Sequence, residues 1–79
     1  MPQFEVSFTE GGTVFVRAHD AGDAVREAIN QANRETGLAI NAAFEMGDPE
    51  PGTGWMEASM GGEVWGRVRP RDRMRFRRD

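Results

Sequence analysis

Residues 3–29 read QFEVSFTEGGTVFVRAHDAGDAVREAI and contain two strand patterns followed by one helix pattern. In residues 3–9 apolar side chains alternate strictly with polar ones, which is typical of a strand with one buried face. Residues 13–19 repeat this alternation, with their apolar positions again on one side. A glycine-containing segment, residues 10–12, separates the two patterns. The stretch is therefore expected to begin with a β-hairpin.

The register of this hairpin is expected to follow its apolar sides. A two-residue Gly-Gly turn would place apolar positions opposite polar ones. A three-residue loop over residues 10–12, with one glycine in the left-handed conformation, places Phe8 opposite Val14 and keeps the sides matched. On the other side of the hairpin this register places Glu5 opposite Arg17, as an ion pair across two strands.

The segment after the hairpin has the pattern of an amphipathic helix. Asp20 is a good N-cap residue, and the acidic Asp23 suits the first turn. We predict a helix over residues 21–36, with Gly37 as its C-terminal cap. Its apolar stripe is mostly alanine, so the helix is expected to pack closely on a sheet. The stripe consists of Ala21, Ala24, Val25, Ala28, Ile29 and Ala32.

The second half of the chain contains three more strand patterns. Apolar residues alternate through residues 38–46, and a loop rich in glycine and proline follows over residues 47–54. Residues 55–60 and 64–69 are expected to form a second hairpin. Matched apolar sides favour a three-residue loop, Gly61 to Glu63. The expected opposite pairs are Met56 and Val68, Met60 and Val64, Glu57 and Arg67, and Ser59 and Trp65.

The order of these patterns is ββαβββ. It predicts an α+β fold with an antiparallel sheet of about five strands and one helix packed on one face. Residues 1–69 are expected to form a single compact domain, because 79 residues suffice for one small domain and not two. Residues 70–79 are expected to be an arginine-rich C-terminal tail or an extension of the last strand.

Composition excludes several classes of site. The chain has no cysteine, which excludes disulfides, thiolate zinc sites and thiol nucleophiles. It has no apolar run near the roughly 20 residues needed to span a bilayer, so we expect a cytoplasmic protein without membrane contact. His19 is the single histidine, no carboxylates stand at a distinctive spacing, and Ser7 and Ser59 have no base nearby in sequence. We therefore expect no enzyme, no catalytic residue, no metal and no cofactor.

The charges are separated along the chain. Residues 67–79 contain seven arginines and two aspartates, whereas residues 1–66 contain three arginines and eleven carboxylates. Arginine occupies every odd position from 67 to 77, so an extended chain would project these side chains to one side. Such a strip suits phosphate or carboxylate groups; the alternative is a solvated tail beyond Pro70. The strip gives five candidate partner-binding residues: Arg69, Arg71, Arg73, Arg75 and Arg77.

Three aromatic residues complete the candidate binding set. The expected registers leave Phe15, Trp55 and Trp65 on the side of the sheet away from the core, with Trp55 beneath Arg69. Large apolar side chains grouped on one exposed face mark an interface. The alternative is that the loop, the tail or a second subunit covers this face. The carboxylates of residues 1–66 could form an acidic patch that mimics nucleic acid, or an ordinary solvated surface.

The hairpin and helix over residues 4–25 resemble a pattern frequent among short proteins of phages and mobile elements. In size, lack of cysteine and charge separation, the whole chain resembles the small anti-CRISPR proteins of phages and prophages. Those that block type I systems commonly bind the Cascade surveillance complex and prevent target DNA from docking. The resemblance therefore implies a non-catalytic inhibitor, acting in the cytoplasm of a bacterial host cell, with a protein complex such as Cascade as its partner.

Two further partners remain open. The alternative function is a small nucleic-acid-binding protein that uses the C-terminal arginine strip, with affinity that falls steeply with salt. A homodimer is also conceivable, because an acidic body and a basic, strand-like tail are complementary to each other in a second copy.

Overall fold

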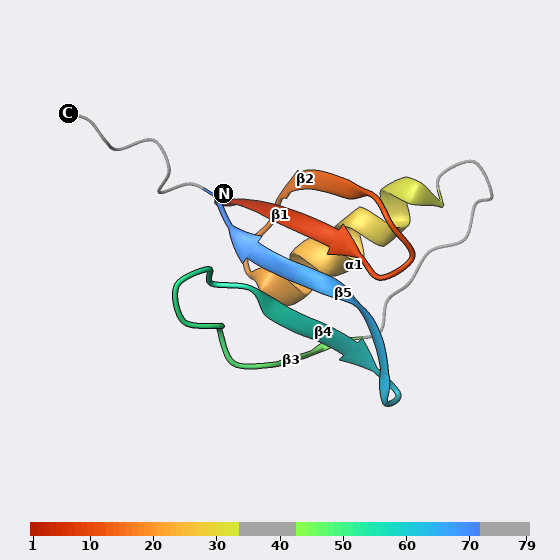
Figure 1. Ribbon diagram of the computed structural model, residues 1–79. Coiled ribbons are helices and arrows are strands. Elements are labelled where there is room, and N and C mark those ends of the chain that lie inside the picture. Colours follow the sequence, from red (N-terminus) through yellow and green to blue (C-terminus); the bar gives the residue numbers. More distant parts are fainter. Residues whose placement is uncertain (34–42, 72–79) are drawn as a thin grey trace.

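The structure, a computed structural model, describes residues 1–33 and 43–71 (Figure 1). In this part of the chain one helix and five antiparallel strands confirm the expected α+β class. The sheet has the order β2-β1-β5-β4-β3. The elements are β1 (Gln3–Phe8), β2 (Thr13–Arg17), α1 (Ala21–Ala32), β3 (Glu45–Met46), β4 (Met56–Met60) and β5 (Glu63–Pro70).

The strand β5 joins the two halves of the sheet. It pairs with β4 in the second hairpin and with β1 on its other side, from Phe8 opposite Gly66 to Phe4 opposite Pro70. Figure 1 shows β5 and β1 side by side although they lie at opposite ends of the sequence. The pairing extends one residue past the strand, because the Arg71 amide donates to the Gln3 carbonyl oxygen at 2.9 Å.

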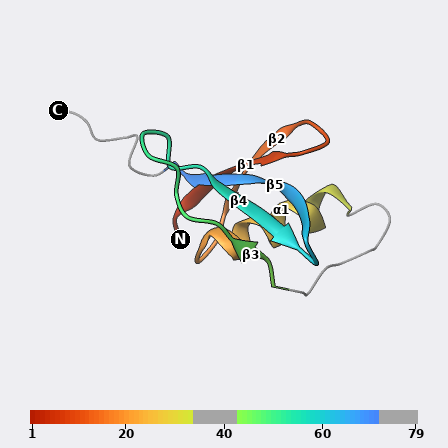
Figure 2. The same cartoon turned by 60° about the horizontal axis from the view of Figure 1, so that its bottom comes forward.

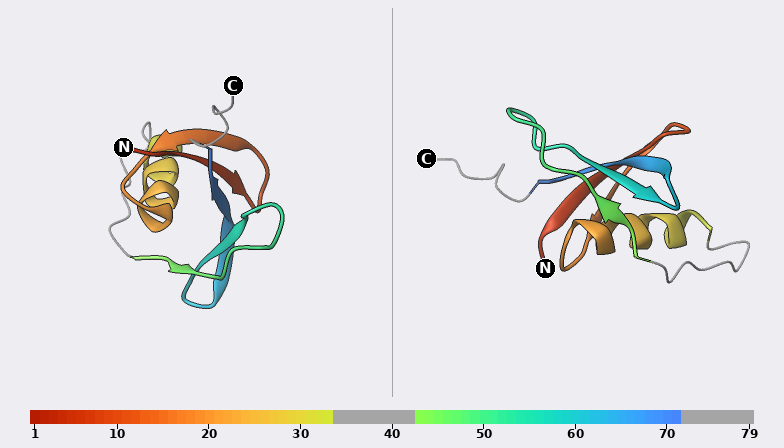
Figure 3. Two further views of the ribbon diagram at one scale, coloured as in Figure 1. Left: turned by 90° about the vertical axis from the view of Figure 1, so that its left-hand side faces the viewer. Right: turned by 90° about the horizontal axis from the view of Figure 1, so that it is seen from below.

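The core lies between the sheet and α1, which forms a second layer against one face (Figure 2; Figure 3, right). As expected, Asp20 caps the helix: its carboxylate accepts a hydrogen bond from the Asp23 amide at 2.9 Å. Close packing follows from the alanine-rich stripe, since small side chains let the helix approach the strands. The buried apolar residues are Phe4, Val6, Val16, Ala18, Ala24, Val25, Ala28, Ile29, Phe44, Ala58 and Val68.

Two elements are predicted to run into residues 34–42, which the structure does not describe. The helix α1 ends at Ala32, with Asn33 as its C-cap, before the predicted end at residue 36. The predicted cap, Gly37, lies outside the described residues. Of the strand predicted over residues 38–46, the described part contains only the two residues of β3.

The first hairpin has the predicted loop length at a different place. Its three-residue loop is Thr9 to Gly11, closed by hydrogen bonds of 3.0 Å from the Phe8 amide to the Gly12 carbonyl and from the Gly11 amide to the Phe8 carbonyl. The predicted loop over residues 10–12 is therefore wrong by one position. Gly11, the last residue of the loop, and Gly12, which follows it, adopt positive φ of 116° and 93°, a conformation that glycine takes without steric strain.

This displaced loop moves the register of the hairpin by two residues. Val6 lies opposite Val14, and Glu5 lies opposite Phe15, where the sequence predicted Arg17. A shift of two keeps every side chain on its own face because strand side chains alternate with period two. The apolar side was therefore predicted correctly, and the Glu5–Arg17 pair was not.

The second hairpin closes on a tighter turn than expected. Gly61 and Gly62 form a two-residue turn with φ of 63° and 83°, the conformation that favours Gly-Gly in hairpins. A β-bulge compensates, because Ala58 pairs with Gly66 and Ser59 with Val64, which leaves Trp65 without an opposite residue on β4. Beyond the bulge the predicted register is confirmed, with Met56 opposite Val68 and Glu57 opposite Arg67.

At Gly66, the residue after Trp65 in the bulge, β5 comes very close to β1. A Cβ at this position would lie 2.6 Å from the Ser7 carbonyl oxygen and 3.1 Å from the Phe8 Cα. Only glycine fits without moving the backbone. Beside it, the Thr9 amide donates to the Trp65 carbonyl at 3.0 Å, so the bulge is fastened to the first hairpin.

Candidate functional site

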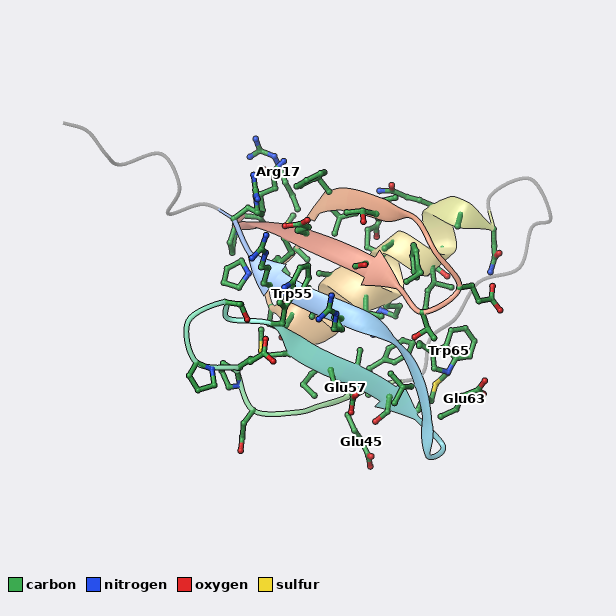
Figure 4. All side chains as sticks on the ribbon, viewed as in Figure 1. Arg17, Glu45, Trp55, Glu57, Glu63 and Trp65 are labelled. Atoms are coloured by element: carbon green, nitrogen blue, oxygen red, sulfur yellow. The ribbon has the colours of Figure 1, made fainter. Side chains whose placement is uncertain are left out.

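The face of the sheet turned away from α1 carries four of the five candidate residues that the structure describes, and we call it the outer face. On β5, Val68 is fully buried under the helix. The neighbouring Arg67 and Arg69 therefore project to the outer face, because side chains alternate along a strand. On β2, the exposed Phe15 and Arg17 alternate with the buried Val16 in the same way. Figure 4 looks onto this face.

Trp55, just before β4, lies beneath two guanidinium groups. The Cζ atoms of Arg67 and Arg69 lie 4.6 and 4.4 Å from the centre of its ring. The predicted contact with Arg69 is confirmed, and the contact with Arg67 is an addition. Each such contact contributes about 0.5–1 kcal/mol at an exposed site. The ring thus restricts where the two guanidiniums can lie, and their N–H groups remain able to donate to other acceptors.

Glu5, at the middle of the outer face, accepts hydrogen bonds from two arginines. Its Oε1 accepts hydrogen bonds from Arg69 Nε at 2.9 Å and from Arg71 Nη1 at 3.3 Å. The Glu5 side chain is only 15% exposed, so this pair is screened less than a surface ion pair. The Arg71 guanidinium lies 5.2 Å from the centre of the Phe15 ring.

These contacts form one continuous row across β2, β1, β5 and the start of β4. We call it the arginine–aromatic ladder. The Glu5 carboxylate is shared by two of its three guanidiniums, and Arg67 makes no ion pair within the described chain. The row therefore has excess positive charge. Its members are Phe15, Arg71, Glu5, Arg69, Trp55 and Arg67.

The opposite side of the outer face is acidic. Glu45 on β3 and Glu57 on β4 are exposed, and Glu45 lies opposite Ser59, close to Glu57. In Figure 4 these carboxylates lie below β5, whereas Arg17 lies at the other edge, beyond β1. The charge separation seen along the sequence thus becomes a separation across one face of the sheet.

Trp65 does not lie on the outer face, so its predicted position there is wrong. Its ring is partly buried against the core and contacts Phe44 edge-on, with ring centres 6.0 Å apart. The cause is the β-bulge: Trp65 and Gly66 together occupy one position opposite Ala58, which turns Trp65 to the helix side. Its Nε1 is buried without a hydrogen-bond partner in the described residues.

The sequence reasoning missed Glu5 and Arg67 as members of the site. Arg67 follows the same odd-numbered alternation as Arg69 and Arg71, and that signal was available. Glu5 was assigned to Arg17, which lies opposite Gln3 in the structure. The remaining candidates, Arg73, Arg75 and Arg77, lie outside the described residues.

Residues 1–33 and 43–71 contain no group of three His, Asp or Glu side chains placed to hold a metal ion. His19 is exposed between β2 and α1. Within the same residues no helix has the length and apolar character needed to traverse a membrane.

Comparisons with known proteins add no relative to this geometry. No protein-family model, no curated protein and no solved structure matches the chain.

Proposed function

We propose that the chain is a non-catalytic inhibitor that binds a protein through the arginine–aromatic ladder. In its most concrete form it is an anti-CRISPR protein that binds a type I Cascade complex and blocks target DNA binding, in the cytoplasm of a bacterial host. The observation that carries the binding role is the ladder itself. Three guanidiniums are fixed against Trp55, Phe15 and Glu5 on an exposed sheet face.

Arginine and tryptophan are the residues that most often contribute large binding energies at protein interfaces. Here the arginine side chains already contact Trp55, Phe15 and Glu5 before any partner binds, which lowers the entropy lost on binding. Phe15, half exposed at 50%, adds an apolar contact next to Arg71. The ladder therefore combines an exposed aromatic ring, Phe15, with guanidinium donors whose positions are restricted by Trp55 and Glu5.

The choice of Cascade rests on the resemblance described above. A small chain without cysteine and with separated charges suits an inhibitor that masks a surface by binding. In this proposal the ladder contacts the complex, and the bulk of the domain obstructs the approach of DNA. Complementary charge would steer the encounter and speed association.

The test uses purified type I Cascade, a labelled double-stranded target and the full chain. DNA binding is followed by fluorescence anisotropy while wild type, Arg67→Gln or Arg26→Gln is added. Arg26 is the matched control because it lies on α1, paired with Asp23, on the other side of the sheet. We expect wild type and Arg26→Gln to block DNA binding equally, and Arg67→Gln to need about tenfold more protein, the equivalent of 1.4 kcal/mol. Unchanged DNA binding in a large excess of wild type would refute the Cascade assignment.

Nucleic-acid binding is the second candidate, and one observation favours it. Arg67, Arg69 and Arg71 project from one side of β5, with Arg17 beyond them on β2. Phosphate groups could bind along such a row, with an affinity that falls steeply as salt rises. Glu5 and Glu57 within the same face oppose a polyanion, which places this candidate second.

A further inference from the structure

We infer that the outer face binds an extended, carboxylate-rich segment of its protein partner, lying along β5. This inference rests on the proposed function and specifies it. It assigns the contact to the basic side of the outer face and not to the acidic body, and it gives the partner segment a charge and a conformation.

The spacing of the arginines sets the shape of the ligand. Arg67, Arg69 and Arg71 occupy alternate positions of a backbone that stays paired with β1 through residue 71. Alternate residues of a strand are about 6.6–6.8 Å apart. A second extended chain has the same repeat, so acidic side chains at every other position would meet successive guanidiniums.

Glu5 shows that carboxylates fit these guanidiniums. One of its oxygens already accepts hydrogen bonds from both Arg69 and Arg71. Each guanidinium carries five N–H donors, and these contacts use one from each. Arg67 donates to no carboxylate in the described chain. Unused donors remain along the whole row, held in position by the aromatic rings.

Two observations favour a peptide over a nucleic acid. Proteins that bind single strands stack bases on exposed aromatic rings, whereas Trp55 here already has two guanidiniums within 4.6 Å and Phe15 has one nearby. In addition, Glu57 lies on the strand next to β5, about 4.8 Å from strand to strand. A nucleic-acid double helix, which is wider, would also lie over the Glu57 carboxylate. A single extended peptide segment can stay over β5 and β1.

The experiment uses the two tryptophans as internal reporters. The full chain is labelled with ¹⁵N, and the two indole N–H signals are followed by NMR; a Trp55→Phe variant assigns them. The probe is a capped twelve-residue peptide of alternating glutamate and serine, with a glutamine–serine peptide as its matched control. A twelve-residue oligothymidylate is the nucleic-acid arm. All titrations are done at low and at high salt.

We expect the acidic peptide to shift the Trp55 signal, to leave the buried Trp65 signal in place, and to lose affinity as salt rises. The glutamine peptide should have no effect. Arg67→Gln should weaken binding about fivefold and Arg26→Gln should not change it. Glu5→Gln should strengthen binding roughly threefold, because it removes an internal competitor from two guanidiniums.

Each contrary result overturns the inference. These results are no shift with the acidic peptide, equal shifts with both peptides, a shift of Trp65 alone, or a stronger effect of oligothymidylate on Trp55. The peptide test does not involve Cascade, so its failure is separate from failure of the proposed function. Peptide binding without Cascade inhibition would refute the Cascade assignment and leave the inference standing. Cascade inhibition without peptide binding would refute the inference and leave the Cascade assignment standing.

Discussion

Trp55 and Trp65 lie on opposite faces of the same sheet and are held by different forces. Trp65 packs into the core against Phe44, where apolar burial dominates. Trp55 lies on the outer face beneath Arg67 and Arg69, where charge and stacking dominate. The core face thus carries most of the stability, and the outer face can change its chemistry at small cost to the fold.

The largest effect on stability is expected at Gly66, where β5 lies very close to β1. Gly66→Ala would place a Cβ 2.6 Å from the Ser7 carbonyl, a backbone atom that cannot move aside. We expect a loss of about 3 kcal/mol or more in the free energy of unfolding, measured by urea denaturation. Gly22→Ala is the control, since its Cβ meets only Asp20 Oδ1 at 3.6 Å. It should leave stability unchanged or raise it by about 0.5–1 kcal/mol. Equal stability of the two variants would show that β1 and β5 are less tightly joined than described.

The core side of the comparison is tested next with Trp65→Ala. Removing this partly buried ring exposes Phe44 and leaves a cavity, so we expect a loss of about 2–3 kcal/mol in urea denaturation. Peptide or Cascade binding by the folded fraction should be nearly unchanged, because the ladder does not include Trp65. A variant as stable as wild type would place this ring outside the core.

Glu5→Gln tests the charged centre of the outer face. The neutral amide loses the charge in two hydrogen bonds, from Arg69 and Arg71, and we expect a loss of about 1 kcal/mol. Glu57→Gln is the matched control, an exposed glutamate on the same face without an ion pair in the described chain, and should change stability by less than about 0.5 kcal/mol. The difference between Glu5→Gln and wild type should shrink in high salt. A difference that does not depend on salt would mean that shape and not charge accounts for it.

Trp55→Leu should have the smallest effect on stability, about 0.5–1 kcal/mol, since a cation–π contact at a partly exposed site is weak. A double-mutant cycle with Arg69→Gln isolates the stacking itself. We expect a coupling of about 0.5 kcal/mol by thermal denaturation. If the two changes are additive, the ring does not hold the guanidinium, and the ladder is a row of neighbours without mutual support.

The sequence predicted the faces of this sheet better than its turns. Alternation placed Phe4, Val6 and Val16 in the core and Phe15 outside, because burial acts on every second residue. Both hairpin turns were assigned from side-chain matching alone. Paired glycines can close a turn in more than one way, so the sequence did not distinguish a shifted loop in the first hairpin from a bulge in the second.

The same ambiguity decided which site residues were found. Trp55 and Arg69 lie beyond the bulge, where the predicted register holds. Trp65 lies at the bulge, so the face that the sequence predicts for it is wrong. Glu5 was paired within its own hairpin, although its partners are 64 and 66 residues away. The pairing of β1 with β5 is a long-range contact that periodicity in one strand does not reveal.

The position of β5 between β1 and β4 has a consequence for how the molecule forms. The two hairpins can each form from local contacts, but β5 is made after all the other strands and alone joins the β2–β1 pair to the β4–β3 pair. Closing so long a loop is the slow entropic step. During synthesis the first hairpin and the helix therefore cannot become part of the complete sheet until residues 63–70 have left the ribosome. Because Glu5 meets Arg69 only in that step, a partly made chain has no binding face, and completed folding and readiness to bind arrive together.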